Sequence, residues 1–176
     1  VDLSGTSGQL TLPLSLTLGK IDTFVNTSAD KSSCTELIAD RRDHTATKLD
    51  DGRVLVVGGV RESGTSATFW ATTELFDPQA GSFTAGPELA AGGLRRGHRA
   101  TTLEDRRILF TGGKWRYQDQ GTGTISEQVW RPALVFDPAL DDGHGAFAEP
   151  IVMRDARVYH TATLLPDGRV LLAGGE

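Results

Sequence analysis

The feature that most constrains this chain is a block of residues that occurs three times without gaps. Each copy begins with a histidine and ends with paired glycines: residues 44–59 (HTATKLDDGRVLVVGG), 98–113 (HRATTLEDRRILFTGG) and 160–175 (HTATLLPDGRVLLAGG). The first residues of the blocks are 54 and then 62 residues apart, and an arginine lies three positions before each block: Arg41, Arg95 and Arg157. A fixed internal period indicates an architecture built from one small motif repeated along the chain.

Each repeat is predicted to form four short antiparallel strands. An alternating stretch from residue 44 reaches Asp51-Gly52, a hairpin signal, and an apolar run over residues 54–57 follows. The third and fourth strands are centred on an aromatic pair in each of the first two repeats: Phe76 with Phe83, and Phe136 with Phe147. The second repeat has Asp105-Arg106 where the others have Asp-Gly, which predicts a strained or lengthened turn.

Paired glycines end every block, where a close approach of two backbones leaves no space for a side chain. They are Gly58 and Gly59, Gly112 and Gly113, and Gly174 and Gly175. The histidines recur with them at His44, His98 and His160. A side chain present in every unit is best explained by a task performed in every unit. We therefore expect these histidines to hydrogen bond the backbone at the start of the inner strand or to bond across to the neighbouring unit. The arginines are expected to form ion pairs between units with Asp43, Glu74 or Asp155.

The H-T-A-T-x-L-x-D-G-R-V-L-V-x-G-G block and the F-D-P-x-x-G-x-F segment that follows it resemble the kelch repeat. Kelch repeats are the blades of one family of β-propellers, and the form seen here is similar to the galactose-oxidase-like propellers of secreted bacterial proteins. The resemblance implies an all-β fold with four-stranded antiparallel blades at about 41–94, 95–156 and, in part, 157–176. It also implies a secreted, periplasmic or cell-surface location.

A closed propeller has about four to eight blades, and four units of the shorter period exceed the 176 residues of the chain. The expectation is an incomplete propeller of about two and a half blades within a larger protein. Its open sheet edges would be covered by further sequence or by other chains.

Residues 1–39 lie outside the recognisable repeats. Leucine alternates through residues 9–18 (QLTLPLSLTL), which predicts a strand with one buried face. This segment is expected to belong either to a preceding β-domain or to a blade that it completes. Cys34, the single cysteine, allows no internal disulfide, and it is either a small buried residue or a partner for a cysteine elsewhere.

Charge and hydropathy exclude several classes of partner. The formal net charge is −5, which argues against nucleic acid as the main partner, because its backbone attracts basic surfaces. The chain contains no apolar run near the roughly 20 residues of a membrane-spanning helix, so no transmembrane segment is predicted.

The two longest connections, residues 60–73 and 114–132, are the candidate binding region. The resemblance places them on the face of the propeller that commonly carries ligand sites, and they contain all three tryptophans. Amphipathic rings among hydrogen-bonding groups are typical of surfaces that bind protein or glycan. The candidate ligand residues are Arg61, Glu62, Trp70, Lys114, Trp115, Arg116, Tyr117, Asp119 and Trp130. In the alternative interpretation, the tryptophans fill gaps between blades or fold the connections onto the sheets.

No catalytic constellation, metal site or cofactor is predicted. The aspartates of residues 137–144 (DPALDDGH) miss the spacing of a calcium loop, which favours a solvated insertion. A copper site like that of galactose oxidase would need a cysteine crosslinked to a tyrosine, and Cys34 lies outside the repeats. The prediction is a non-catalytic binding or scaffolding module for protein or glycan. Two alternatives stay open: the propeller part of an oxidase-type or glycan-acting enzyme with its catalytic residues elsewhere, and a subunit of a structural β-assembly.

Overall fold

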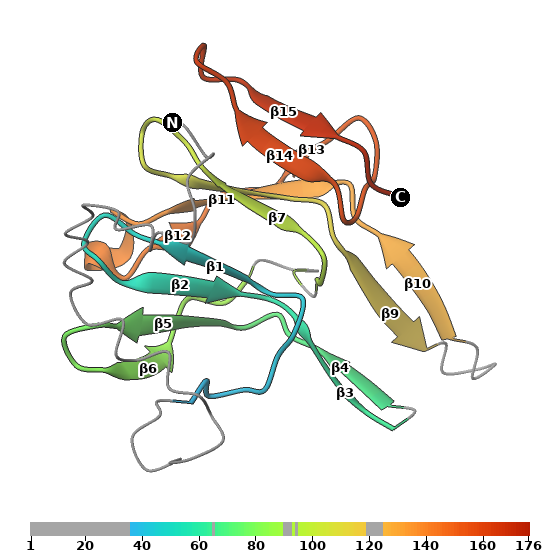
Figure 1. The fold of residues 1–176 in the computed structure, drawn as a ribbon, viewed down its shortest axis with the longest axis horizontal. Coiled ribbons are helices and arrows are strands. Elements are labelled where there is room, and N and C mark those ends of the chain that lie inside the picture. Colours follow the sequence, from blue (N-terminus) through green and yellow to red (C-terminus); the bar gives the residue numbers. More distant parts are fainter. Residues whose placement is uncertain (1–35, 65, 90–92, 94, 119–124) are drawn as a thin grey trace, which may run out of the picture. The chain divides into compact units, whose positions relative to one another are not determined.

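A computed structural model describes residues 36–64, 66–89, 93, 95–118 and 125–176, all within one compact unit that begins at Thr35. The unit is built from small antiparallel sheets (Figure 1), which confirms the predicted all-β class. A 3₁₀ turn at Asp141–Gly143 is the only helical segment among these residues.

The first repeat forms a four-stranded sheet in the order β1-β2-β5-β6, as predicted. Its strands are β1 (Thr45–Lys48), β2 (Val54–Val57), β5 (Thr73–Asp77) and β6 (Ser82–Ala85). Phe76 lies directly opposite Phe83 in the register of β5 and β6, with ring centroids 5.0 Å apart. The aromatic pair that marks the sequence of the first two repeats therefore joins the third and fourth strands of a sheet.

The second repeat forms the same sheet from β7 (Arg99–Thr102), β8 (Ile108–Thr111), β11 (Pro132–Asp137) and β12 (Ala146–Phe147), and β13 (Ile151–Val152) also pairs with β11. The third repeat contributes β14 (Thr161–Leu164) and β15 (Val170–Ala173), which pair with each other. A four-stranded, a five-stranded and a two-stranded sheet from consecutive repeats agree with an incomplete, propeller-like arrangement.

Each of the two long connections folds into a β-hairpin, which the sequence did not predict. The first consists of β3 (Val60–Ser63) and β4 (Ser66–Phe69), and the second of β9 (Lys114–Gln118) and β10 (Ile125–Val129). Both hairpins begin directly after a glycine pair, and both are closed at their base by a tryptophan amide. Trp70 N donates to the carbonyl of Gly59 (3.0 Å), and Trp130 N donates to that of Gly113 (2.8 Å).

The turn at Asp105-Arg106 has the same length as its counterpart in the first repeat. Gly52 N donates to Leu49 O (3.1 Å), and Arg106 N donates to Leu103 O (3.0 Å). Arg106 therefore adopts a φ of 71°, where Gly52 has 93°. The backbone of Arg106 is therefore strained, as predicted, because a residue with a side chain adopts the left-handed conformation. The predicted lengthening of the turn is wrong, since no residue is added.

Consecutive sheets are joined at the glycine pairs. Gly59 N donates to the carbonyl of Arg95 (2.8 Å), and Gly113 N donates to that of Arg157 (2.9 Å). A Cβ on Gly58 would lie 2.6 Å from Arg95 O, whereas a Cβ on Gly174 would meet nothing within 4 Å. The first glycine of each pair is therefore required by the junction with the following sheet, which the third repeat lacks among the described residues. The second glycine packs against its own repeat, since a Cβ on Gly59 would lie 2.8 Å from Arg42 O and one on Gly175 2.6 Å from Val158 O.

The core lies within and between the first two sheets. Its buried residues come from the second and third strands of each sheet and from the segments beside them: Leu49, Leu55, Val57, Leu75, Leu89, Ile108, Phe110, Leu134 and Phe136. The two-stranded third sheet is more open, and Leu171 on β15 is 53% exposed. The hairpins thus project from the two sheets that share the core.

Candidate functional site

Two of the three repeated histidines, His98 and His160, join neighbouring sheets through threonine hydroxyls. A hydrogen bond of 2.8 Å joins His98 Nε2 and Thr45 Oγ1, and one of 2.7 Å joins His160 Nε2 and Thr111 Oγ1. Both imidazoles are 1% exposed. Burial is the main cause that places the pKa of His98 well below its usual value and lowers that of His160 to about 4. Neutral imidazoles in these positions act as structural links between sheets.

The arginines that precede the histidines differ from the predicted pattern of ion pairs between units. Arg41 is buried and its Nη2 lies 2.6 Å from Glu74 Oε1, but both residues belong to the first repeat. Arg157 lies 3.9 Å from Asp155, only two positions before it. Arg95 has no carboxylate partner among the described residues. The position that Glu74 occupies on β5 is taken by Leu134 on β11.

Burial without a carboxylate lowers the pKa of Arg95 to about 10. Ion pairs that do cross between repeats come from Arg96, the residue after Arg95, which pairs with Asp43 and Glu62, and from Arg106, which pairs with Asp50. Sequence reasoning missed Arg96. The signal was present, because Arg42 and Arg96 occupy the same repeat position, two residues before the histidine.

Arg96 connects the two hairpins. Its Nη1 lies 2.9 Å from Glu62 Oε1 on β3, and its Nη2 lies 3.3 Å from Glu127 Oε1 on β10. Its guanidinium also lies over the Phe69 ring, 5.6 Å from the centroid. The side chain of Arg96 is consequently only 11% exposed, and β4 lies against β9. The two hairpins therefore form one surface.

The Glu127 carboxylate on this surface also forms ion pairs with two basic side chains of its own hairpin. Lys114 Nζ lies 2.9 Å and Arg116 Nη2 3.4 Å from its carboxylate. The hydrogen bond from Lys114 is the largest cause that lowers the pKa of Glu127. The candidate residues Glu62, Lys114 and Arg116 thus lie in one network of charges, held together by Arg96 and Glu127.

The three tryptophans lie on the same hairpins and are half-buried. Trp115 on β9 stacks with Trp130 at the end of β10, with ring centroids 6.1 Å apart. Trp70 donates from Nε1 to the carbonyl of Asp40 (3.0 Å), and the Arg41 guanidinium lies 5.8 Å from its ring centroid. Each tryptophan therefore packs on its own hairpin or base and retains an accessible part.

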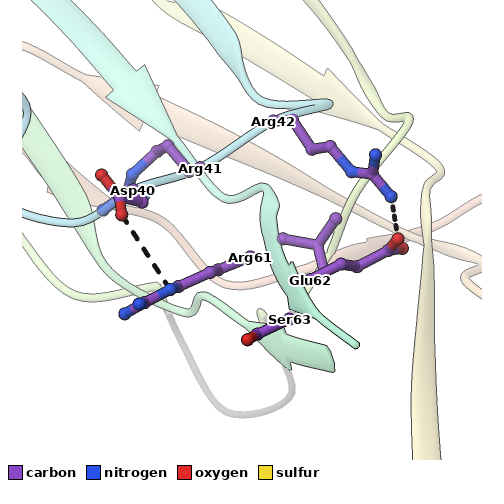
Figure 2. Close-up of a pocket in the computed structure, with 7 residues that line it drawn as sticks. Asp40, Arg41, Arg42, Arg61, Glu62 and Ser63 are labelled. Carbon is purple, nitrogen blue, oxygen red and sulfur yellow. Dashed lines mark hydrogen bonds and ion pairs between the residues drawn. The ribbon is translucent and has the colours of Figure 1, made fainter. Parts of the chain in front are cut away.

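An open pocket of about 440 Å³ lies along the free side of β3. Asp40, Arg41, Arg42, Val60, Arg61, Glu62 and Ser63 line it. Figure 2 shows Arg42 reaching across to Glu62, and Arg61 reaching back toward Asp40. Arg42 and Arg61 are 59% and 58% exposed, so the pocket presents two accessible guanidinium groups.

Two predicted ligand residues cannot be placed in full. Asp119 lies outside the described residues, as does the side chain of Tyr117, whose backbone belongs to β9. Cys34 and the alternating segment 9–18 also lie outside them. In residues 137–144, the Asp137 carboxylate accepts from the amide of Ala139 (2.9 Å) and the neighbouring acidic side chains are exposed.

The described part of the chain contains no group of three or more histidine, cysteine, aspartate or glutamate side chains arranged to hold a metal ion. Nor does it contain a helix long and apolar enough to cross a membrane. Comparison with known proteins found no family that matches the sequence and no curated protein similar to it. The functional interpretation therefore depends on the hairpin surface itself.

Proposed function

We propose that this chain is a segment of a kelch-type β-propeller that serves as a non-catalytic binding or scaffolding module. The repeated block supports the kelch assignment, together with the sheet order β1-β2-β5-β6 and the equivalent junctions at Gly59 and Gly113. Its similarity to propellers of secreted bacterial proteins leads us to propose a secreted or cell-surface location.

The observation that carries the binding function is the pairing of the two hairpins. Hairpins β3–β4 and β9–β10 arise at the same point of consecutive repeats, and Arg96 ties them together. They present half-buried tryptophans beside guanidinium and carboxylate groups, a combination that suits recognition of protein or glycan. A rigid strand pair loses less conformational entropy on binding than an irregular loop would.

The experiment is a screen of the folded protein against an array of glycans and a library of displayed peptides, repeated with Trp115→Ala and Trp70→Ala. We expect at least one ligand class to bind the unchanged protein, with at least about a tenfold loss in one variant, as for a central aromatic contact. Leu140→Ala is the matched control, because this exposed residue lies on the turn after β11. Absence of binding in both screens, or equal binding by all variants, would reject the hairpin surface as the binding site.

A structural β-assembly is the second candidate, and an exposed leucine on the third sheet favours it. Leu171 on β15 is 53% exposed. This function predicts concentration-dependent association in light scattering, lost when Leu172 on β15 is replaced by proline. A monomer at all concentrations would reject it.

A further inference from the structure

The chain contains three Asp-Gly dipeptides: Asp51-Gly52, Asp142-Gly143 and Asp167-Gly168. An aspartate before glycine is open to a spontaneous reaction, because glycine has no Cβ to shield its amide nitrogen. That nitrogen attacks the side-chain carboxyl carbon and closes a five-membered succinimide ring. The reaction requires a carboxyl group that is protonated, so that its hydroxyl leaves as water, and that is free to turn toward the glycine amide.

Two of the three carboxylates are held by an arginine two positions later. Asp51 accepts from the main-chain amide of Arg53 (2.9 Å) and from its Nε (2.7 Å). Asp167 accepts from the same two groups of Arg169, at 3.1 and 2.8 Å. Hydrogen bonds from a guanidinium favour the ionised carboxylate, and the bond from the Arg169 side chain is the largest cause that lowers the pKa of Asp167. Both carboxylates are therefore kept ionised and directed toward the residue after the glycine.

Asp142 lacks this restraint, since a histidine follows its glycine. Its exposed carboxylate forms no hydrogen bond or ion pair with the described residues. The glycine amides do not distinguish the sites, because Gly52, Gly143 and Gly168 each donate to the carbonyl three positions earlier, at 3.1, 3.2 and 3.0 Å. The free carboxylate is therefore the feature that separates Asp142 from the other two aspartates.

The backbone at Asp142 is also strained. Asp141 and Asp142 have φ values of 52° and 51°, in the left-handed region that a residue with a Cβ adopts at a cost in energy. Neither Asp51 nor Asp167 has a positive φ. A main chain that passes through Cβ and Cγ gains a rotatable bond at this point, so the rearrangement relieves the strain.

We propose that Asp142 is a site of spontaneous isoaspartate formation in the folded protein, and that Asp51 and Asp167 are protected from it. Gly143 N bonds to Cγ of Asp142, and the carboxyl hydroxyl leaves with the amide proton as water. A second water molecule opens the ring. Attack at Cγ restores aspartate, whereas attack at the main-chain carbonyl carbon gives isoaspartate of unchanged mass. This modification does not depend on the proposed binding function.

The modification acts on a contact between repeats. Gly143 O accepts from Arg53 Nη2 of the first repeat at 2.6 Å. The turn also packs closely on the core, because a Cβ on Gly145 would overlap the Phe136 ring. An additional main-chain bond beside Gly143 displaces its carbonyl, so isoaspartate should loosen the junction between the first two sheets.

The test is incubation of the folded protein at neutral pH in water labelled with heavy oxygen, followed by peptide mass spectrometry. Each ring opening incorporates one labelled oxygen, so the label in each Asp-Gly peptide counts openings to both products. Resistance to a protease that cleaves before aspartate identifies the isoaspartate. Asp142 should react at least about tenfold faster than Asp51 or Asp167, each of which is restrained by hydrogen bonds from a charged group.

Three variants test the cause. Asp142→Glu keeps the charge but would have to close a six-membered ring, so the product at this site should be lost. Arg169→Gln should accelerate labelling at Asp167 by about fivefold or more. Arg107→Gln is the matched control, because Arg107 Nε binds Asp105 in the same way (2.7 Å) but arginine rather than glycine follows that aspartate. It should change all three rates by less than about twofold.

Thermal melts verify that the variants keep the fold. In concentrated urea the three sites of the unchanged protein should react at similar rates, because the difference arises from the folded structure. Equal rates in the folded protein, or an excess at Asp142 that persists in urea, would overturn the proposal. Unchanged labelling of Asp167 in Arg169→Gln would overturn the protection by arginine on which it depends.

Discussion

The junction between sheets can be tested by adding one methyl group at two equivalent glycines. Gly58 and Gly174 have φ values of 64° and 69°, so alanine at either position incurs the same left-handed strain, about 1–2 kcal/mol. Only at Gly58 would the new Cβ meet the next sheet, 2.6 Å from Arg95 O. Relieving that overlap requires a shift of the junction and weakens the hydrogen bond from Gly59 N, which costs about 1–3 kcal/mol more.

Gly58→Ala should therefore lower the free energy of unfolding by about 2–4 kcal/mol and Gly174→Ala by about 1 kcal/mol, allowing for the reduced entropy of the unfolded chain. The assay is urea unfolding followed by tryptophan fluorescence and by circular dichroism, with coincident transitions required before the values are compared. With a slope of about 2 kcal/mol/M, the midpoints should differ by about 1 M. Equal losses in the two variants would refute the claim that contact with the following sheet, rather than backbone conformation, requires glycine here.

Three further predictions concern single side chains. The pKa of His160 is about 4 in the folded state and about 6.5 in the unfolded state, so the unfolded state binds more protons between these values. The free energy of unfolding should therefore fall as pH decreases through that window, by at most about 1.4 kcal/mol per pH unit for this group. In urea titrations at several pH values, His160→Gln should reduce this dependence on pH. Arg41→Met should lower the free energy of unfolding by about 3–5 kcal/mol, because it leaves the buried Glu74 without its ion-pair partner. In a double-mutant cycle, Arg41→Met combined with Glu74→Leu should recover most of that loss, and equal losses in the single and double variants would contradict the pairing. Arg106→Gly should raise the melting temperature by relieving about 1 kcal/mol of strain, and a decrease would show that the side chain contributes more than the turn costs.

Much of the fold was predictable because its signals are local. Alternation, turn glycines and the aromatic positions defined the four strands of each unit, and the observed sheets follow them. The hairpins were missed because residues 60–73 and 114–132 differ in length and sequence, and the longer connection lacks a short turn signal. Whether these residues pair as hairpins depends more on the sheets from which they project than on their own composition.

The candidate site was predicted only in part. The tryptophans, Glu62, Lys114 and Arg116 were identified because their composition is unusual for a connection. Arg96 and Glu127 were missed, although they organise the charges, because an ion pair between residues 31 positions apart has no local signature. The same applies to Arg41 and Arg95, which look alike in the repeat but face a glutamate in one sheet and a leucine in the other.

Local patterns were thus sufficient to specify the all-β repeat, its strands and the glycines that end each block. These properties depend on side-chain alternation and on the backbone freedom of single residues. Tertiary structure alone decided which arginine is covered and which is open, because Arg42 and Arg96 are equivalent in sequence and differ only in their neighbours. The open pocket beside β3 exists because the side of the first repeat that corresponds to the Arg96 contact has no hairpin packed against it among the described residues.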